Sequence, residues 1–169
     1  MPGNFYLFIN FNQALRLGHV GWGFQIDESG LFLFGSTDHL YHHPWWDLPA
    51  WVDYLYVAPG EKTDFWCQTG DEGTMLETMS STRAHIWYHA CKKVKVGDAS
   101  PAAARKTVDW LETAGWSLLV NNCVQHTYSI ATEYGVGRDM PDPWRSAVRQ
   151  IPRVWFAAVE GEYIELRAR

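Results

Sequence analysis

The sequence predicts an α+β domain in which an antiparallel sheet packs against helices. Apolar segments with the two-residue period of strands fill the N-terminal part, and turn residues join them. Segments bounded by helix start and stop signals fill the second half. The length of 169 residues, with 47% hydrophobic and 20% charged residues, suits a single domain over residues 1–169 with one core.

The N-terminal strands are the clearest elements. Residues 4–11 (NFYLFINF) are apolar and favour a strand. Residues 18–26 (GHVGWGFQI) alternate, then residues 27–30 (DESG) supply turn chemistry and residues 31–35 (LFLFG) return, which predicts a hairpin. One face of the first hairpin strand carries Val20, Trp22, Phe24 and Ile26, and the other carries His19, Gly21, Gly23 and Gln25.

The middle of the chain mixes a loop with a helix and a strand. Residues 36–59 are rich in His, Trp and Pro, so we expect an ordered loop that ends in a short strand at 54–58. Asp71 can cap a helix over residues 73–80. The segment 84–96 (AHIWYHACKKVKV) indicates another strand.

Two longer helices are predicted in the last third. Pro101 follows Ser100 at a helix start, and the helix should run to residue 114, where Gly115 ends it. A second helix should run from about residue 122 to 134, followed by a glycine. The remaining elements are a short apolar piece at 116–120, a short helix around 144–150, a strand over 153–159 (RVWFAAV) and a charged tail.

Composition excludes several classes of partner. The net charge of −5, without a block of like charge, argues against nucleic acid. No apolar run approaches the roughly 18 residues of a membrane span, and the first residues have no export signal, so we expect a cytoplasmic protein. Cys67, Cys91 and Cys123 are odd in number and lack metal-ligand spacing, so we expect neither disulfides nor a zinc site, and no cofactor.

Cys123 is the candidate nucleophile. It follows Asn121 and Asn122 at the expected start of a helix, where the macrodipole and unpaired N–H groups favour the thiolate. Either asparagine can cap the helix, and the N–H of Cys123 or the side chain of Asn122 can receive an oxyanion. The alternative interpretation is a buried cysteine that only fills the core.

His19 is the candidate base. Gly21 and Gly23 follow it on the same strand face and leave room for a helix to approach closely, so the imidazole can reach a cysteine at a helix end. In the alternative interpretation, His19 is a half-buried histidine with satisfied hydrogen bonds, and the glycines only permit strand twist.

These motifs resemble a known superfamily. A strand with Gly-His-x-Gly-x-Gly, a hairpin partner and, much later, Asn-Cys at a helix start is similar to the circularly permuted papain-like (NlpC/P60-like) cysteine hydrolases. More distantly, residues 122–126 (NCVQH) resemble the Asn-Cys-Glu-His run of the lecithin retinol acyltransferase-like branch, but Val124 follows the cysteine here and the histidine comes one place later. The resemblance implies a permuted papain-like fold, with Cys123 as nucleophile and His19 as base.

The resemblance also implies a third polar residue that orients the imidazole. A hairpin without a bulge sets His19 opposite Asp38, whereas a bulge at Gly30 sets it opposite His39. Asp38 is the first choice, because a carboxylate fixes the tautomer and stabilises the imidazolium. His39 is the second choice, and Gln25, on the same strand face as His19, is the third.

The aromatic and histidine-rich loop offers two weaker hypotheses. The tryptophans of residues 42–51 favour packing, with a substrate groove at Trp22, Trp45 and Trp46 as the less favoured interpretation. His39, His42 and His43 have near-helical spacing for a metal, but Pro44 disrupts that geometry and no further ligand is suitably spaced, so no metal is expected.

The sequence therefore predicts a cysteine-dependent hydrolase or acyltransferase with a Cys-His-polar triad. Its substrate would be a small-molecule or peptide acyl compound, such as an amide, a thioester or an ester. The alternative, from another class, is a non-catalytic binding module of the same fold with a Trp-rich apolar groove.

Overall fold

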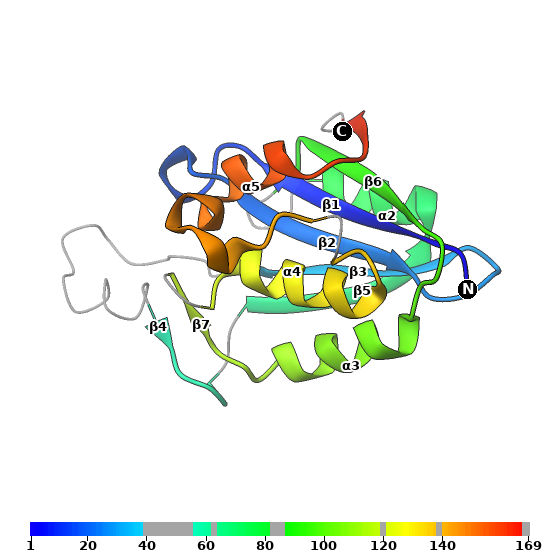
Figure 1. The fold of residues 1–169 in the computed structure, drawn as a ribbon, viewed down its shortest axis with the longest axis horizontal. Coiled ribbons are helices and arrows are strands. Elements are labelled where there is room, and N and C mark those ends of the chain that lie inside the picture. The colour runs from blue at the N-terminus through cyan, green and yellow to red at the C-terminus, as the bar shows by residue number, and fades with distance from the viewer. Residues whose placement is uncertain (39–55, 62–63, 82–86, 119–120, 138–139, 167–169) are drawn as a thin grey trace.

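The computed structural model describes residues 1–38, 56–61, 64–81, 87–118, 121–137 and 140–166. It confirms the α+β class, because six antiparallel strands form a sheet in the order β5-β3-β2-β1-β6-β8, with helices on both faces (Figure 1). The strands are β1 Gly3–Asn10, β2 His19–Gln25, β3 Leu31–Asp38, β5 Asp64–Asp71, β6 Ala90–Val96 and β8 Glu162–Glu165. A separate short pair joins β4 Tyr56–Val57 to β7 Trp116–Ser117.

The helices divide unequally between the two faces. Figure 1 shows α4 in front of the sheet and α2 behind it, with α3 packed against α4. The α-helices are α2 Glu72–Ser80, α3 Pro101–Leu111, α4 Cys123–Tyr134 and α5 Pro152–Ala158. Short 3-10 helices are η1 Ala14–Arg16, η2 Pro143–Arg145 and η3 Ala147–Gln150. Within the described residues, none of the helices has the length and hydrophobicity that crossing a bilayer requires.

Alternation along the strands creates two apolar layers. We call the side covered by α4 and α5 the α4 face, to which strand residues such as Trp22 and Phe24 point. We call the opposite side the α2 face, which carries Phe8 and Phe34. Both layers are buried, and in β1 every residue from Phe5 to Ile9 is fully buried.

The glycines of β2 admit α2 and not the cysteine-bearing helix. A Cβ added to Gly21 would lie 2.8 Å from the Cε of Met79, and one added to Gly23 would lie 2.6 Å from the Sδ of Met75. Both methionines belong to α2. The expectation that this glycine face receives the helix of Cys123 is therefore wrong, because α4 packs on the other face, over Trp22 and Phe24.

Most elements with local start and stop signals are confirmed. The first strand and the hairpin lie where expected. Asp71 caps α2, with its carboxylate accepting from the N–H of Thr74 at 2.7 Å. Helix α4 begins after Asn122 and ends at Gly135, whose φ of +114° is the left-handed conformation that glycine favours.

Several elements differ from the expectation. Residues 152–158 form a helix instead of a strand: Pro152 occupies the first helical position, and the N–H of Trp155 donates to the carbonyl of Ile151. This places Trp155 and Phe156 in the core. The edge strands β5 and β8 are not predicted by the sequence. The segment around 144–150 forms two 3-10 helices, η2 and η3, and the strand predicted over 84–96 begins at Ala90 in its described part.

Candidate active site

Cys123 is the first residue of α4, and a capping box fixes the turn around it. The Oδ1 of Asn122 accepts from the N–H of Val124 at 2.9 Å and of Gln125 at 3.4 Å. In return, the Oε1 of Gln125 accepts from the N–H of Asn122 at 2.8 Å. The capping box engages the backbone N–H groups of Asn122 and Val124, on either side of Cys123, but not the N–H of Cys123. The N–H of Cys123 is therefore suited to stabilise an oxyanion.

Asn122 serves mainly as a helix cap. While its Oδ1 accepts from the helix, its Nδ2 donates to the carbonyl of Leu118 at 2.9 Å. Both ends of the amide are thus engaged in holding the turn. The N–H of Cys123 is therefore a better candidate for an oxyanion donor than the Asn122 side chain.

A pocket of about 290 Å³ opens where α4 begins. Four segments line it: the turn before β2, residues from β7 onward, the start of α4, and the stretch from η3 into α5. His19, Asn122 and Cys123 all border this space, so the structure brings three of the predicted site residues together. The rest of the lining is mainly apolar and includes Leu17, Trp116, Leu118 and Ile151.

His19 comes to the pocket from the α2 side of the sheet. It is the first residue of β2, and its Nε2 lies 2.8 Å from the Oγ of Ser36. The Tyr88 hydroxyl donates to the same Oγ at 2.8 Å, and its ring centroid is 6.1 Å from that of the imidazole. Both Cys123 and His19 are among the residues that the structure describes, and no hydrogen bond joins the Cys123 sulfur to the His19 imidazole. The two residues thus border one pocket from opposite faces of the sheet.

The hairpin register is the one without a bulge. Trp22 pairs with Gly35, and the N–H of Ile26 donates to the carbonyl of Leu31 at 2.8 Å. The β2–β3 pairs end at Trp22 and Gly35, and only an extension of this register would set His19 opposite Asp38, so that pairing stays a prediction. The backbone of Asp38 pairs with Asp64 of β5.

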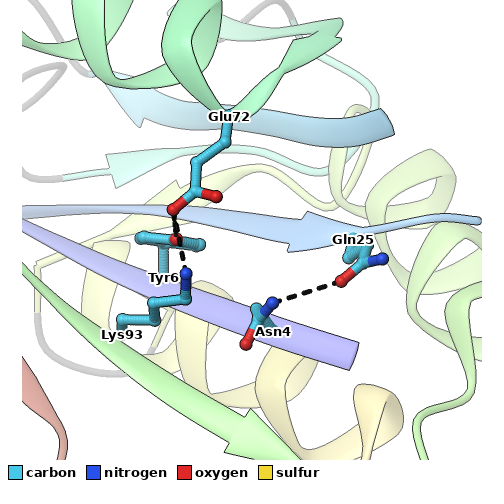
Figure 2. A network of polar contacts seen from close by, with 5 residues as sticks. All are labelled: Asn4, Tyr6, Gln25, Glu72 and Lys93. Carbon is cyan, nitrogen blue, oxygen red and sulfur yellow. Dashed lines mark hydrogen bonds and ion pairs between the residues drawn. The ribbon is translucent and has the colours of Figure 1, made fainter. Parts of the chain in front are cut away.

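The other two candidates for the third polar residue are His39 and Gln25. His39 lies outside the described residues. Gln25 is at the far end of β2, about 20 Å from His19 at the rise of an extended strand. There its Oε1 accepts from the Nδ2 of Asn4 at 3.3 Å (Figure 2), and its Nε2 donates to the carbonyl of Asp27.

Ser36 is the residue that the sequence analysis missed. Extending the hairpin register sets it opposite Gly21, two positions along from His19 and on the same face, where Tyr88 and Met79 lie over the glycine. Once the hairpin register is fixed, the sequence shows that Ser36 lies diagonally across from His19, within hydrogen-bonding reach of a long side chain.

Trp22 does not border a groove. Its side chain is 1% exposed and stacks on Phe24 with a centroid separation of 5.9 Å. Trp45 and Trp46 lie outside the described residues, as do His42 and His43. Among the residues that the structure describes, no group of three His, Cys, Asp or Glu side chains is arranged to hold a metal ion.

A second histidine, His126, is buried one turn along α4 from Cys123. Its Nδ1 lies 2.9 Å from the Oγ1 of Thr37, and its Nε2 lies 2.8 Å from the Oδ1 of Asn121. Asn121 uses its Nδ2 to donate to the carbonyls of Ala114 and Gly115, so its Oδ1 is an acceptor. The Nε2 of His126 therefore carries the proton, and Thr37 donates to Nδ1.

Burial keeps His126 neutral. It lowers the pKa of the imidazole to about 4, well below the ordinary value of 6.5. The sequence analysis found no partner for this histidine. Adjacent residues of β3 thus hold two histidines on opposite faces of the sheet: Ser36 holds His19, and Thr37 holds His126 in the helix that carries Cys123.

Comparison of the chain with models of known families, with curated proteins and with solved structures finds no match. The function is therefore inferred from the chain's own residues.

Proposed function

We propose that the chain is a cysteine-dependent hydrolase or acyltransferase that acts through Cys123 and His19 on an amide, a thioester or an ester. The observation that supports this most is that these two residues, far apart in sequence, border one pocket, with Cys123 at the first position of a capped helix. The proposal includes the permuted papain-like arrangement that the sequence resembles, because the strand of the base precedes the helix of the nucleophile.

The reaction would proceed through an acyl-enzyme. The Cys123 sulfur gives its proton to His19 and attacks the acyl carbon, and the N–H of Cys123 stabilises the oxyanion. When the intermediate collapses, the bond to the leaving group breaks and His19 returns the proton to that group. Water or another acceptor, deprotonated by His19, then attacks the thioester and releases Cys123.

The Oγ of Ser36 lies 2.8 Å from the Nε2 of His19, a contact that can fix the orientation of the imidazole. Ser36 takes the orienting role, with Tyr88 donating to its hydroxyl oxygen. Catalytic hydrogen bonds often tighten only in the substrate complex, and the proposed mechanism requires the imidazole to close on the sulfur at that stage.

Labelling of the cysteines tests the proposed pair. Iodoacetamide is applied at pH 7, and modification of each cysteine is followed by peptide mass spectrometry. We expect Cys123 to react faster than its 6% exposure suggests, and His19→Ala to slow this reaction markedly. Exposed Cys67 is the internal control, since its rate should not change.

A matched control removes a different imidazole. His89 does not line the pocket, and its Nδ1 accepts from the N–H of Phe11. His89→Ala should therefore leave the labelling of Cys123 unchanged. If His19→Ala and His89→Ala have equal effects, the proposed coupling is wrong.

The alternative proposal is a module that binds an apolar ligand in the same pocket without chemistry. The mainly apolar lining favours it, as does the separation of Cys123 and His19 onto different faces of the sheet. In that case His19→Ala would not change Cys123 labelling, and a fluorescent apolar probe would bind equally well to the wild type and to Cys123→Ser. Equal labelling together with equal probe binding would favour this alternative.

A further inference from the structure

Apolar side chains remain exposed around the mouth of the pocket. Leu17 is 46% exposed and Leu118 is 40% exposed, and both line the opening. Val148, at 57%, projects from η3, whose Ala147 and Gln150 border the same space. Val154 is also exposed and lies close by, because the N–H of its neighbour Arg153 donates to the carbonyl of Leu17. We call Leu17, Leu118, Val148 and Val154 the rim patch.

The segments that carry the rim patch are also basic. Residues 11–20, 116–126 and 143–159 contain four arginines and no lysine, aspartate or glutamate. Their formal charge is +4, or +2 when the flanking Asp142 and Glu160 are included, in a chain of −5, which leaves −7 on the remaining residues. The arginines are Arg16, Arg145, Arg149 and Arg153.

The arginines lie on the same end of the molecule as the rim patch. The Nη1 of Arg153 donates to the carbonyl of Arg16 at 3.2 Å, which joins the start of α5 to η1. Arg149 belongs to η3, which borders the pocket. Arg145 pairs with Asp142 at 3.6 Å and is exposed. Figure 1 shows these segments, in blue and orange, side by side at the end of the sheet where α4 begins.

We propose that this end of the molecule docks on an anionic lipid bilayer. The four rim residues enter the interface between head groups and acyl chains, and the arginines contact the lipid phosphates. Arginine suits this place because its fork of donors matches phosphate oxygens and its stem can lie along an apolar surface. The acidic remainder of the chain is repelled by the same membrane, which orients the pocket toward the lipid.

Charge complementarity favours a lipid surface over a second copy of the chain. Two copies that meet through this end would bring like charges together, four arginines against four. A bilayer with anionic head groups supplies the opposite charge and an apolar layer at once. The docking stands independently of the chemistry proposed at Cys123.

Vesicle sedimentation tests the proposal with the 169-residue chain. Phosphatidylcholine vesicles with and without phosphatidylglycerol are the two probes. We expect binding to the anionic vesicles and little to the neutral ones, with weaker binding as salt is added. Arg149→Gln combined with Arg153→Gln should weaken binding about 30-fold. Leu17→Ser combined with Val148→Ser should also weaken it, while the thermal midpoint of each variant stays close to that of the wild type.

The matched control lies on α3. Trp110 is 59% exposed and Lys106 is also exposed, so Lys106→Ala with Trp110→Ser removes one charge and one large apolar side chain away from the pocket. This control should bind like the wild type. Equal binding of the rim and control variants would overturn the proposal, and so would a failure of the wild type to bind anionic vesicles. Cys123→Ala should bind normally, which separates this test from that of the reaction.

Discussion

Within the described residues, the α4 face of the sheet is covered by α4 and α5, with α3 packed on α4, and has a large apolar cluster, whereas the α2 face has one helix and a smaller cluster. Two groups of hydrogen-bonded side chains supplement the packing on the α2 face: Tyr6, Glu72 and Lys93 in one, and His19, Ser36 and Tyr88 in the other. Cys123 belongs to the α4 face and the imidazole of His19 to the α2 face. A substitution that weakens the packing on one face can therefore leave the packing on the other face unchanged. The two faces can therefore be tested separately.

The largest expected effect comes from the core of the α4 face. Phe24 is fully buried and packs on Tyr134 of α4, with ring centroids 5.2 Å apart. Phe24→Ala should lower the free energy of unfolding by about 3–5 kcal/mol, because it removes apolar contacts and leaves a cavity. Urea unfolding followed by tryptophan fluorescence measures this loss.

Phe32 provides the matched position on the α2 face. It is 2% exposed and belongs to the smaller cluster, which the side chains of α2 can partly refill. Phe32→Ala should therefore cost less than Phe24→Ala. An equal or larger loss for Phe32→Ala would contradict the view that the α4 face contributes more of the packing energy.

The second prediction concerns pH and the buried histidine of α4. His126 has a folded pKa of about 4 and an ordinary value of 6.5, so between these values the unfolded chain binds more protons than the folded one. Stability should therefore rise with pH across this window, by at most about 3 kcal/mol from this group. In His126→Gln the slope of unfolding free energy against pH should be smaller.

Urea unfolding at a series of pH values between 4 and 6.5 measures both slopes. The comparison rests on slopes, so it remains valid even though the variant itself is less stable. Burial also lowers the pKa of His89, and this histidine is present in both proteins, so its contribution cancels. Equal slopes in the two proteins would show that His126 is not the group that titrates.

The parts of the fold that the sequence predicted are those with signals inside the element. Asn122 and Gly135 mark both ends of α4, and the alternation of β2 with its DESG turn marks the hairpin. The edge strands β5 and β8 were missed because their half-exposed residues lack a clear apolar pattern. Helix α5 was read as a strand because its aromatic and β-branched residues favour strands, and the position of Pro152 was overlooked.

The sequence predicted those site residues that lie at the start of a helix or a strand. Cys123 at the first turn of α4 and His19 at the start of β2 border the same pocket. The contacts with Ser36 and Thr37 were not predicted, because they depend on how β3 lies beside β2 and how α4 docks on β3. No local pattern shows that two neighbouring hydroxyl residues each hold a histidine on a different face.

The third prediction separates the hydroxyl of Thr37 from its bulk. Thr37 is 2% exposed and donates to the Nδ1 of His126. Thr37→Val keeps the shape but leaves that nitrogen without a donor, which should cost about 1–3 kcal/mol. We also expect slower iodoacetamide labelling of Cys123, because the first turns of α4 lose their tie to β3. Thr37→Ser keeps the hydroxyl and should therefore retain most of the wild-type labelling rate. If Thr37→Ser is labelled as slowly as Thr37→Val, Thr37 contributes through packing and not through its hydrogen bond.

The smallest expected effect lies on the α2 face, at the polar group of Tyr6, Glu72 and Lys93 (Figure 2). The fully buried Tyr6 donates its hydroxyl proton to Glu72, and the Nζ of Lys93 lies 2.9 Å from the same carboxylate. Burial raises the pKa of Glu72, but the hydrogen bonds from Tyr6 and Lys93 outweigh it, so the net pKa is below the ordinary value. This contribution to stability is present above the ordinary carboxyl pKa and is lost as pH falls through the folded one.

Tyr6→Phe should therefore lower the free energy of unfolding by about 1 kcal/mol at neutral pH, a modest value because the Glu72 side chain is 43% exposed. The difference from wild type should shrink as Glu72 becomes protonated, since the carboxylate then no longer accepts a charge-assisted bond. Tyr163→Phe, at an exposed position on β8, is the matched control and should change stability little. Labelling of Cys123 should stay at the wild-type rate in both variants. A slower rate in Tyr6→Phe would mean that the two faces are coupled across the sheet.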